Sequence, residues 1–341
     1  MKLVNTKDAV GHVLCHDITQ IIKGVKKDRV FKKGHVVAEE DIPVLLSVGK
    51  EHLYIWEKDE NMLHENEAAE ILYEICKGEN VYGGEVKEGK IELFAEVDGL
   101  LKLNVDKLDE INCLDDIIIA TRHNNFPVKK GEKLAGTRVT PLIIEKEKLE
   151  KAREVAGNEK LINIIPFEHK KVGIVTTGSE VFYGRIKDTF GPVIVDKFKP
   201  YGAEILGQEI VNDDMEQIKN AILSFVEKGA DIIVCTGGMS VDPDDLTPSA
   251  IKSTGTDIVT YGAPVLPGAM FLLSYYNGNL PILGLPGCVM YAKSTIFDLV
   301  LPRVMAGEIL TKRDLTKLWH GGLCLGCDVC HYPNCSFGKT L

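Results

Sequence analysis

The sequence lacks any apolar run of the roughly 18 residues that a membrane-spanning helix requires, so we expect no membrane span. Residues 1–8 contain no apolar stretch of the kind found in signal peptides, and we therefore expect a cytoplasmic protein. Positive charge is in deficit as well: 40 Lys and Arg face 50 Asp and Glu, which gives a formal net charge of −10. A nucleic-acid surface needs clustered Lys and Arg, so we expect no nucleic-acid partner.

A disulfide framework is also missing. The chain has nine cysteines, an odd number. Five of them are scattered along the sequence, at Cys15, Cys76, Cys113, Cys235 and Cys288. This distribution favours a reducing compartment over a secreted, disulfide-bonded fold.

The chain does contain enough apolar sequence for two or three cores, since 45% of its 341 residues are hydrophobic. Changes in pattern predict four parts. Residues 1–60 form an N-terminal α+β region, and 61–165 form a β-rich middle region with a connecting helix. Residues 166–310 form an α/β domain, and 311–341 form a cysteine-rich tail.

Local spacing predicts the elements of the first half. Apolar residues at helical intervals favour helices at 39–49 and 66–77. Glutamates and lysines mixed along 145–155 favour a solvated connecting helix there. Alternating or β-branched runs favour strands at 52–56, 90–97 and 117–121.

From Lys170 onward, buried strands alternate with helices. The expected strands are 172–176, 231–235 and 281–285. The expected helices are 193–201, a helix capped by Asp213-Asp214, one that begins with Thr247 as N-cap, and 292–305. This alternation predicts a doubly wound, mainly parallel sheet with helices on both faces, and ligands bind such sheets at the carboxyl ends of the strands.

One of these strand ends carries an unusual loop. Gly237 and Gly238 follow the strand 231–235, and Ser240, Asp242, Asp244 and Asp245 come next. Glycines let the backbone approach a phosphate closely, but carboxylates beside it would repel the phosphate unless a hard cation lies between them. The loop thus indicates a phosphorylated ligand held with Mg²⁺. The alternative is that the aspartates cap the helix that begins near Pro248.

Two further loops, Thr176-Thr177-Gly178 and Leu285-Pro286-Gly287, each follow a predicted strand. Because parallel strands end at one edge of the sheet, we expect all three loops to meet at one pocket.

Residues 170–307 resemble the molybdopterin-binding domain shared by proteins of molybdenum cofactor biosynthesis. The resemblance is carried by motifs in family order: Thr176–Val181, Asp188–Pro192, Val211–Asp214, Thr236–Val241, Asp245, Leu266–Gly268 and Leu285–Gly287. Residues 9–14 and 34–37 are loosely similar to the front of one member, molybdopterin molybdenumtransferase.

This resemblance implies an activity and a site. In the molybdenumtransferases, adenylylated molybdopterin binds with a divalent cation, molybdate is inserted at the dithiolene, and AMP is released. The family's acidic catalytic positions correspond to Glu180, Asp213 and Asp245, and Mg²⁺ is assigned to Asp242 and Asp245. The implied pterin-binding residues are Thr177, Gly178, Ser179, Asp188, Gly237, Gly238, Ser240, Pro286 and Gly287.

The sequence departs from the family pattern at several points. Asp242 stands where glycine is common, and Ala269-Met270 replaces a Lys-Pro pair. The segment 188–192 is closer to the adenylyltransferase branch of the family. Two alternatives therefore stay open: adenylylation of molybdopterin, or non-catalytic binding and delivery of the cofactor to a molybdoenzyme partner. A homodimer is also expected from the family.

The tail holds a second motif, Cys324-x₂-Cys327-x₂-Cys330-x₄-Cys335, with His331 beside it. Four thiols within twelve residues predict a metal site. Three cysteines in one tight run favour a [4Fe–4S] cluster, because structural Zn²⁺ sites commonly use two separated pairs. Zn²⁺ is the close alternative, and a third is transfer of sulfur or molybdenum to the pocket.

Overall fold

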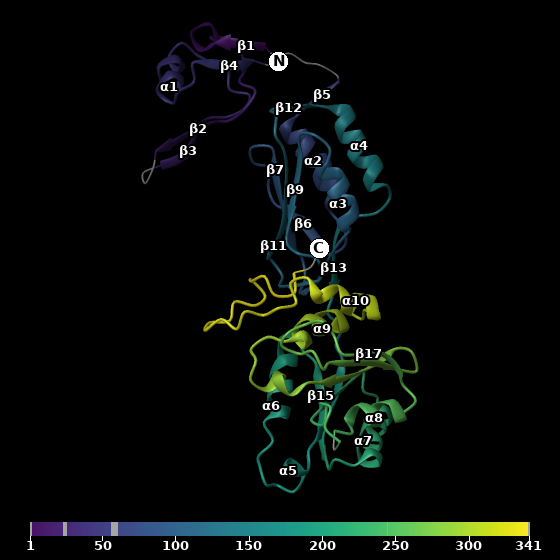
Figure 1. Ribbon diagram of the computed structural model, residues 1–341. Coiled ribbons are helices and arrows are strands. Elements are labelled where there is room, and N and C mark those ends of the chain that lie inside the picture. The colour runs from purple at the N-terminus through teal and green to yellow at the C-terminus, as the bar shows by residue number, and fades with distance from the viewer. Residues whose placement is uncertain (1, 23–25, 56–60, 244, 340–341) are drawn as a thin grey trace. The chain divides into compact units, whose positions relative to one another are not determined.

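A computed structural model describes residues 2–22, 26–55, 61–243 and 245–339 (Figure 1). The chain divides into two compact units. The N-terminal unit comprises 1–96, 103–122 and 131–163, and the C-terminal unit comprises 97–102, 123–130 and 164–341. Within the described ranges, no helix has the length and apolarity needed to cross a membrane. The division into four parts stays a prediction.

The first part of the N-terminal unit is β-rich, as the sequence predicts. Strand β1 (Lys2–Asn5) pairs antiparallel with β4 (His52–Ile55), and β2 (Ile18–Ile22) pairs antiparallel with β3 (Lys26–Phe31). Helix α1 (Asp41–Ser47) lies within the predicted range 39–49. A small core holds this part together; its buried members are Ala9, Leu14, Ile18, Val37, Leu45 and Leu53. The last residue of the predicted strand 52–56 lies outside the described residues.

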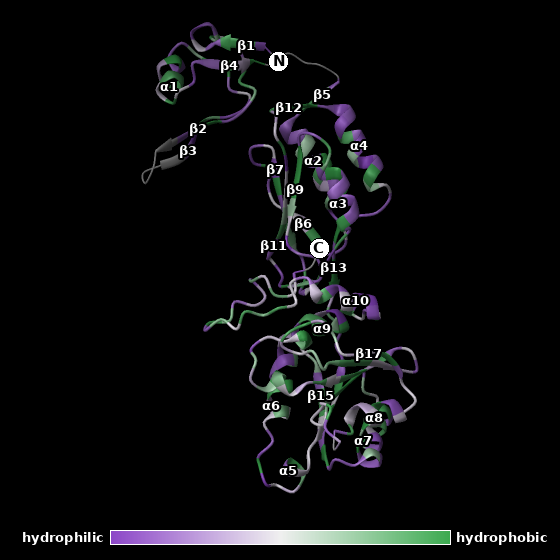
Figure 2. Ribbon diagram, in the orientation of Figure 1, coloured by the Kyte–Doolittle hydropathy of each residue, from purple (hydrophilic) through white to green (hydrophobic). Residues whose placement is uncertain are grey.

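The rest of this unit contains a four-stranded antiparallel sheet in the order β6-β7-β11-β9. Its strands are β6 (Val81–Gly83), β7 (Lys90–Ala95), β11 (Lys133–Val139) and β9 (Ile117–Thr121). The unit also contains the pair β5 (Met62–His64) and β12 (Ile143–Glu145), and the helices α2 (Glu65–Cys76), α3 (Val105–Asn112) and α4 (Lys146–Ala156). Helix α4 is mainly purple in Figure 2 and buries only Leu149, Ala152 and Ala156, which confirms the predicted solvated helix.

The C-terminal unit is built on a six-stranded sheet in the order β15-β14-β16-β19-β18-β17. Its strands are β14 (Lys171–Thr177), β15 (Glu204–Val211), β16 (Ile232–Thr236), β17 (Asp257–Tyr261), β18 (Leu272–Tyr276) and β19 (Leu280–Leu285). The first four strands of the order are parallel, and β18 runs antiparallel to both of its neighbours. Most of a second, three-stranded sheet belongs to the same unit. Its strands, in order, are β10 (Phe126–Val128), β8 (Gly99–Leu103) and β13 (Ile162–Pro166).

Helices cover both faces of the six-stranded sheet, which confirms the doubly wound α/β prediction. On one face, α7 (Met215–Glu227) and α8 (Thr247–Ser253) pack over Val175, Ile233 and Cys235. On the other, α6 (Phe190–Phe198) and α9 (Ile296–Met305) pack over the side chains of Ile174 and Val234. Successive residues of a strand point to opposite faces, so strands buried on both faces are apolar throughout.

Three predicted helix starts are wrong, each for a local reason. Helix α6 begins at Phe190, because Asp188 accepts the N–H groups of Phe190 and Gly191. Helix α9 begins at Ile296 and not at 292, because Thr295 and Asp298 form a capping box there. Helix α8 has Leu246 as its N-cap, and the Thr247 hydroxyl is used elsewhere.

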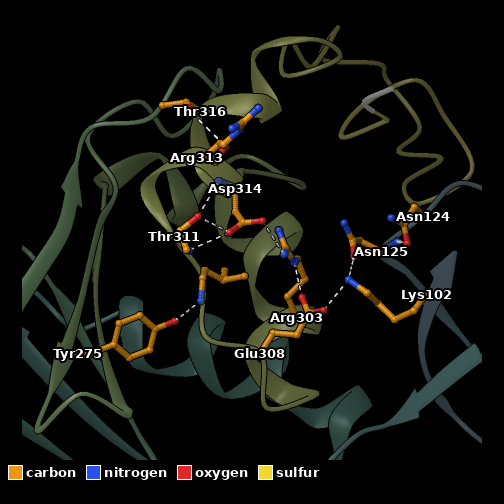
Figure 3. Close-up of polar contacts among 11 residues, drawn as sticks. Lys102, Asn124, Asn125, Tyr275, Arg303, Glu308, Thr311, Arg313, Asp314 and Thr316 are labelled. Carbon is orange, nitrogen blue, oxygen red and sulfur yellow. Dashed lines mark hydrogen bonds and ion pairs between the residues drawn. The ribbon is translucent and has the colours of Figure 1, made fainter. Parts of the chain in front are cut away.

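An ion-pair network ties α9 to the short helix α10 (Lys312–Thr316), as Figure 3 shows. Arg303 pairs with Glu308 at 2.5 Å and with Asp314 at 3.0 Å, and Lys102 also reaches Glu308. Burial by itself would raise the pKa of Asp314. Hydrogen bonds from Thr311 and Arg303 outweigh burial and lower that pKa to about 2.

Candidate functional site

The carboxyl ends of β14, β16 and β19 lie next to one another. Thr176 of β14 is in register with Thr236 of β16, which is in register with Leu285 of β19. The loops that follow these three strands therefore leave the sheet at a common edge. We call this the carboxyl edge; among the described residues it comprises 176–180, 236–243, 245 and 285–287.

The two glycines of the second loop touch the first loop. Gly237 has φ +85°, and a Cβ placed on it would lie 2.1 Å from the carbonyl oxygen of Thr177. Gly238 has φ +53°, and its Cβ would lie 2.9 Å from the Thr247 hydroxyl. Only glycine permits both the left-handed backbone and this close approach. The glycine pair therefore locks the loops after β14 and β16 together.

Two buried hydroxyls reinforce this contact. The Thr247 hydroxyl donates to the carbonyl of Gly237 at 2.8 Å, and the hydroxyls of Thr177 and Thr247 are 3.1 Å apart. Because each hydroxyl has one proton, Thr177 is the donor to Thr247. The buried Thr177 side chain thus holds the second loop in place through Thr247, and the Thr177 backbone is part of the carboxyl edge.

Asp213 links the first loop to the turn before α7. Its Oδ2 accepts the N–H of Ser179 at 2.7 Å and the Ser179 hydroxyl at 3.0 Å. That hydroxyl also lies 2.7 Å from Asn212 Oδ1. The adjacent Asp214 caps α7 through the N–H of Gln217 at 2.9 Å, so the cap prediction holds for Asp214, whereas Asp213 contacts Ser179.

Asp245 folds the acidic loop. Its Oδ2 accepts the N–H of Ser240 at 3.0 Å, and its own N–H donates to the carbonyl of Asp242 at 3.0 Å. The Tyr261 hydroxyl donates to the carbonyl of Met239 at 2.9 Å. Burial, and then the charge of Asp245, raise the pKa of Tyr261. Asp242 is exposed, Asp245 is half-buried, and Asp244 lies outside the described residues.

Asp188 belongs to a polar chain that leads to the sheet. Gln208 donates through Nε2 to Asp188 Oδ2 and to Thr176 Oγ1, both at 2.8 Å. The Thr236 hydroxyl donates to Thr176 Oγ1 at 3.2 Å. Asp188 is therefore held by the start of α6 and by Gln208.

The remaining predicted residues lie at the same edge. The Glu180 carboxylate folds back over Gly178, whose added Cβ would lie 3.1 Å from Glu180 Oε1. Pro286 is buried at the end of β19, and a Cβ on Gly287 would meet no atom within 4 Å. The Gly287 backbone thus borders open space, which leaves room for a ligand.

Among the described residues, no three His, Cys, Asp or Glu side chains converge as a ready metal site. This holds for Asp242 and Asp245 and for the four cysteines of the tail. Mg²⁺ does not need three protein carboxylates, because it is commonly held by one or two carboxylates together with water and substrate phosphates. The donor set of the acidic loop therefore fits a cation that arrives with a phosphorylated ligand.

The cysteines of the tail lie away from the carboxyl edge loops in sequence and line a cavity of their own. This cavity has a volume of about 370 Å³, and Cys324, Cys327, Cys330, Cys335 and His331 are among its lining residues. All four cysteines are free thiols. A hydrogen bond with Ser294 lowers the pKa of Cys330.

Sequence reasoning missed the roles of three residues near the edge. These are Gln208, Tyr261 and Thr247, whose hydroxyl connects the first two loops. Gln208 and Tyr261 lie on strands without a motif around them. The sequence carries no local signal for their partners, because those partners are brought near only by the sheet. Thr247 had a signal, a hydroxyl residue before Pro248, but the same signal is typical of an N-cap.

Comparisons with known proteins place the edge in a family context. A model of the family described as "Probable molybdopterin binding domain" matches residues 173–306, and residues 3–57 match a domain of unknown function, DUF8806. The chain is 36% identical to a CinA-like protein of Mycobacterium tuberculosis and 35% identical to one of Mycobacterium avium, each over 90 residues. Those residues are 26% of this chain and 21% of each relative, so the chain spans about a fifth of these relatives.

Solved structures that the chain resembles include the molybdopterin biosynthesis enzyme MoaB of Thermus thermophilus. Its identity is 23% and its TM-score 0.34, over 41% of this chain and 98% of that one. CinA of Thermoplasma acidophilum, a protein of unknown function, has 19% identity and a TM-score of 0.35, over 40% and 98%. The nearer likeness to the molybdenumtransferases stays a prediction. Residues 173–306, which contain the loops of the carboxyl edge, match the family model described as "Probable molybdopterin binding domain", as the ordered motifs predicted.

Proposed function

We propose that the carboxyl edge binds molybdopterin, an anionic and phosphorylated pterin, and that the protein acts in molybdenum cofactor biosynthesis. One observation carries the proposal: three strand-end loops meet at one edge within residues 173–306, and Gly237 touches Thr177 there. Gly237 and Gly238 hold the first two loops together, and the backbone at Gly287, where no atom lies within 4 Å of an added Cβ, is a surface that a phosphate group can approach closely.

The reaction that we propose is Mg²⁺-dependent insertion of molybdate into adenylylated molybdopterin. Molybdate and the pterin are substrates, and AMP leaves. Asp242 and Asp245 would hold the cation against the pyrophosphate. Bound there, Mg²⁺ would offset the negative charge that grows when the phosphoanhydride bond breaks.

Asp213, and Asp245 in addition to its role toward the cation, position the loops in this proposal. Asp213 fixes the backbone and hydroxyl of Ser179, and Asp245 fixes the backbone of Ser240, so both hold the two loops in shape. Glu180 lies over Gly178 with its carboxylate at the edge, where it can take up or release a proton during the reaction.

The test is Asp245→Asn. Asparagine keeps an oxygen that can accept the N–H of Ser240, so the loop is expected to keep its shape while one negative charge is removed. Molybdate insertion in a reconstituted assay should then fall by about two orders of magnitude or more. The matched control is Asp257→Asn, at an exposed position that begins β17. Unchanged turnover of Asp245→Asn would remove this residue from the mechanism.

A second candidate is adenylylation of molybdopterin by ATP. The observation that favours it is the position of Asp188, which holds the start of α6 through two N–H groups and pairs with Gln208. ATP consumption that requires free molybdopterin but not molybdate would support adenylylation. Turnover that requires molybdate and the adenylylated pterin would support insertion.

A third candidate, binding and delivery of the cofactor to a molybdoenzyme, is favoured by Ala269-Met270, which leave that segment without a phosphate-facing lysine. Tight pterin binding without turnover of either substrate would support delivery.

A further inference from the structure

The cysteine tail is a closed loop attached to the C-terminal unit at its base. The N–H of Gly338 donates to the carbonyl of Gly321 at 2.9 Å. Gly321 has φ +83°, and a Cβ there would lie 2.6 Å from the carbonyl oxygen of Lys339. Residues 321 and 338 thus bring the two ends of the loop together. The four cysteines lie within the chain that they enclose.

The first cysteine is fixed by backbone hydrogen bonds. Leu266 donates its N–H to the carbonyl of Gly322, and Cys324 donates its N–H to the carbonyl of Leu266, both at 2.8 Å. The Cys324 side chain also packs against the core beneath the sheet. Its position is therefore set by the domain and not by the loop alone.

The fourth cysteine is fixed from the other end of the loop. Tyr332 donates its hydroxyl to the carbonyl of Asp298 on α9 at 2.8 Å, and the Phe337 side chain is 3% exposed within the core. Cys335, between these two anchors, packs against the same core. Cys324 and Cys335 are therefore two half-buried thiols held by anchored chain.

The two middle cysteines lie on the open side of the loop. Cys327 and Cys330 are exposed. Lys293 donates to the carbonyl of Asp328 at 2.6 Å, and Ser294 Oγ lies 3.4 Å from Cys330 Sγ, so residues 293–294 support this part of the loop. All four cysteines line the same cavity of about 370 Å³, but among the described residues no three of their side chains converge as a metal site.

We propose that this loop holds a [4Fe–4S] cluster through Cys324, Cys327, Cys330 and Cys335. Four free thiols on one cavity supply the ligand number of a cubane, and the Cys-x₂-Cys-x₂-Cys run is the spacing that wraps one. Each thiol loses its proton when it ligates iron. The anchored pair Cys324 and Cys335 receives the cluster, and the exposed pair closes over it.

Two apolar side chains suit this closure. Leu325 and Val329 are 74% and 65% exposed, and they alternate with the first three cysteines in sequence. Folding of Cys327 and Cys330 onto a cluster would bring them over it. An apolar cover limits the access of solvent to an iron–sulfur centre.

The experiment uses the full chain, purified without oxygen and with no pterin added, so its result is independent of the proposed function. We expect a brown protein with iron and sulfide at about four of each per chain. The iron and sulfide contents of Cys330→Ser and of Cys335→Ser should each be at least tenfold lower than those of the unsubstituted protein. Cys113→Ser, at an exposed cysteine outside the tail, should keep them.

Two results would overturn the proposal. One is a colourless protein, whether it contains one zinc per chain or no metal. The other is full iron and sulfide content in both tail variants. Thermal unfolding of each variant after removal of iron identifies any that does not fold. Cys327→Ser, at an exposed thiol without a core contact, then serves as the deciding variant.

Discussion

Two Gly→Ala variants can distinguish the cost of a strained backbone from the cost of pushing the loop at Thr177 away from the glycine pair. Gly237→Ala and Gly229→Ala place the same methyl group on backbones of similar φ, +85° and +76°. At Gly229 the methyl group meets no atom within 4 Å, whereas at Gly237 it lies 2.1 Å from the carbonyl oxygen of Thr177. Gly229→Ala is therefore the matched control.

The magnitudes follow from these distances. An alanine in the left-handed region costs about 1–2 kcal/mol in either variant. Gly237→Ala must also separate the ends of β14 and β16 by about 1 Å, and such overpacking costs a further ~1–3 kcal/mol. With about 2–4 °C lost per kcal/mol in a domain of this size, the midpoint of thermal unfolding should fall further in Gly237→Ala than in the control.

Pterin binding is the second readout for the same pair. Separation of the two loops should weaken molybdopterin binding at least tenfold in Gly237→Ala, measured by anaerobic equilibrium titration. Gly229→Ala should bind within about twofold of the unsubstituted protein, because Gly229 lies in the turn that precedes β16, away from the loop that follows it. Equal unfolding midpoints and equal affinities for the two variants would refute the argument that the glycine pair shapes the site.

Further predictions concern the interior of the C-terminal unit. Thr177→Val removes the donor to Thr247 and should lower the free energy of unfolding by about 1 kcal/mol, measured by chemical denaturation. Phe337→Ala should cost about 3–5 kcal/mol and release the end of the tail, measured by hydrogen exchange; no change in exchange would contradict the anchor. The folded pKa of Asp314 is depressed from 3.8 to about 2, so its stabilisation is complete above pH ~4 and is lost as the pH falls toward 2. The free energy of unfolding of Asp314→Asn should therefore be lower than that of the unsubstituted protein by at most about 2 kcal/mol at neutral pH, and this difference should become smaller in acid. A difference that becomes larger in acid would contradict a lowered pKa for Asp314.

The sheet of the C-terminal unit was predictable because its signals are local. Buried apolar runs such as 172–176 and 231–235 indicate strands, and Gly237-Gly238 directly after a run indicates a tight loop. Since parallel strands end at one edge, the convergence of the loops followed without any knowledge of side-chain contacts.

The tertiary partners within the site were not predictable in the same way. Gln208 joins Asp188 to Thr176 only because β15 lies beside β14. Asp213 could be taken for a cap like Asp214, and its contact with Ser179 depends on the packing of two loops. Residue type and spacing identify which groups are polar and near a strand end, but the sheet order decides which of them meet.

Two errors were avoidable. The Thr295–Asp298 spacing is a capping-box pattern, so the start of α9 at Ile296 was available from the sequence. Asp188 two residues before Phe190 is a similar signal for α6. For the tail, the cysteine spacing predicted the number of ligands but not the anchors at Leu266 and Asp298, which lie far away in sequence.

Native mass spectrometry of the full chain, purified without oxygen from cells that make molybdopterin, tests the central claim most directly. The account predicts a bound species with the mass of molybdopterin or its adenylylated form on the unsubstituted protein and on Gly229→Ala, and its loss from Gly237→Ala. Absence of any pterin from the unsubstituted protein, or equal occupancy in all three proteins, would contradict binding at the carboxyl edge.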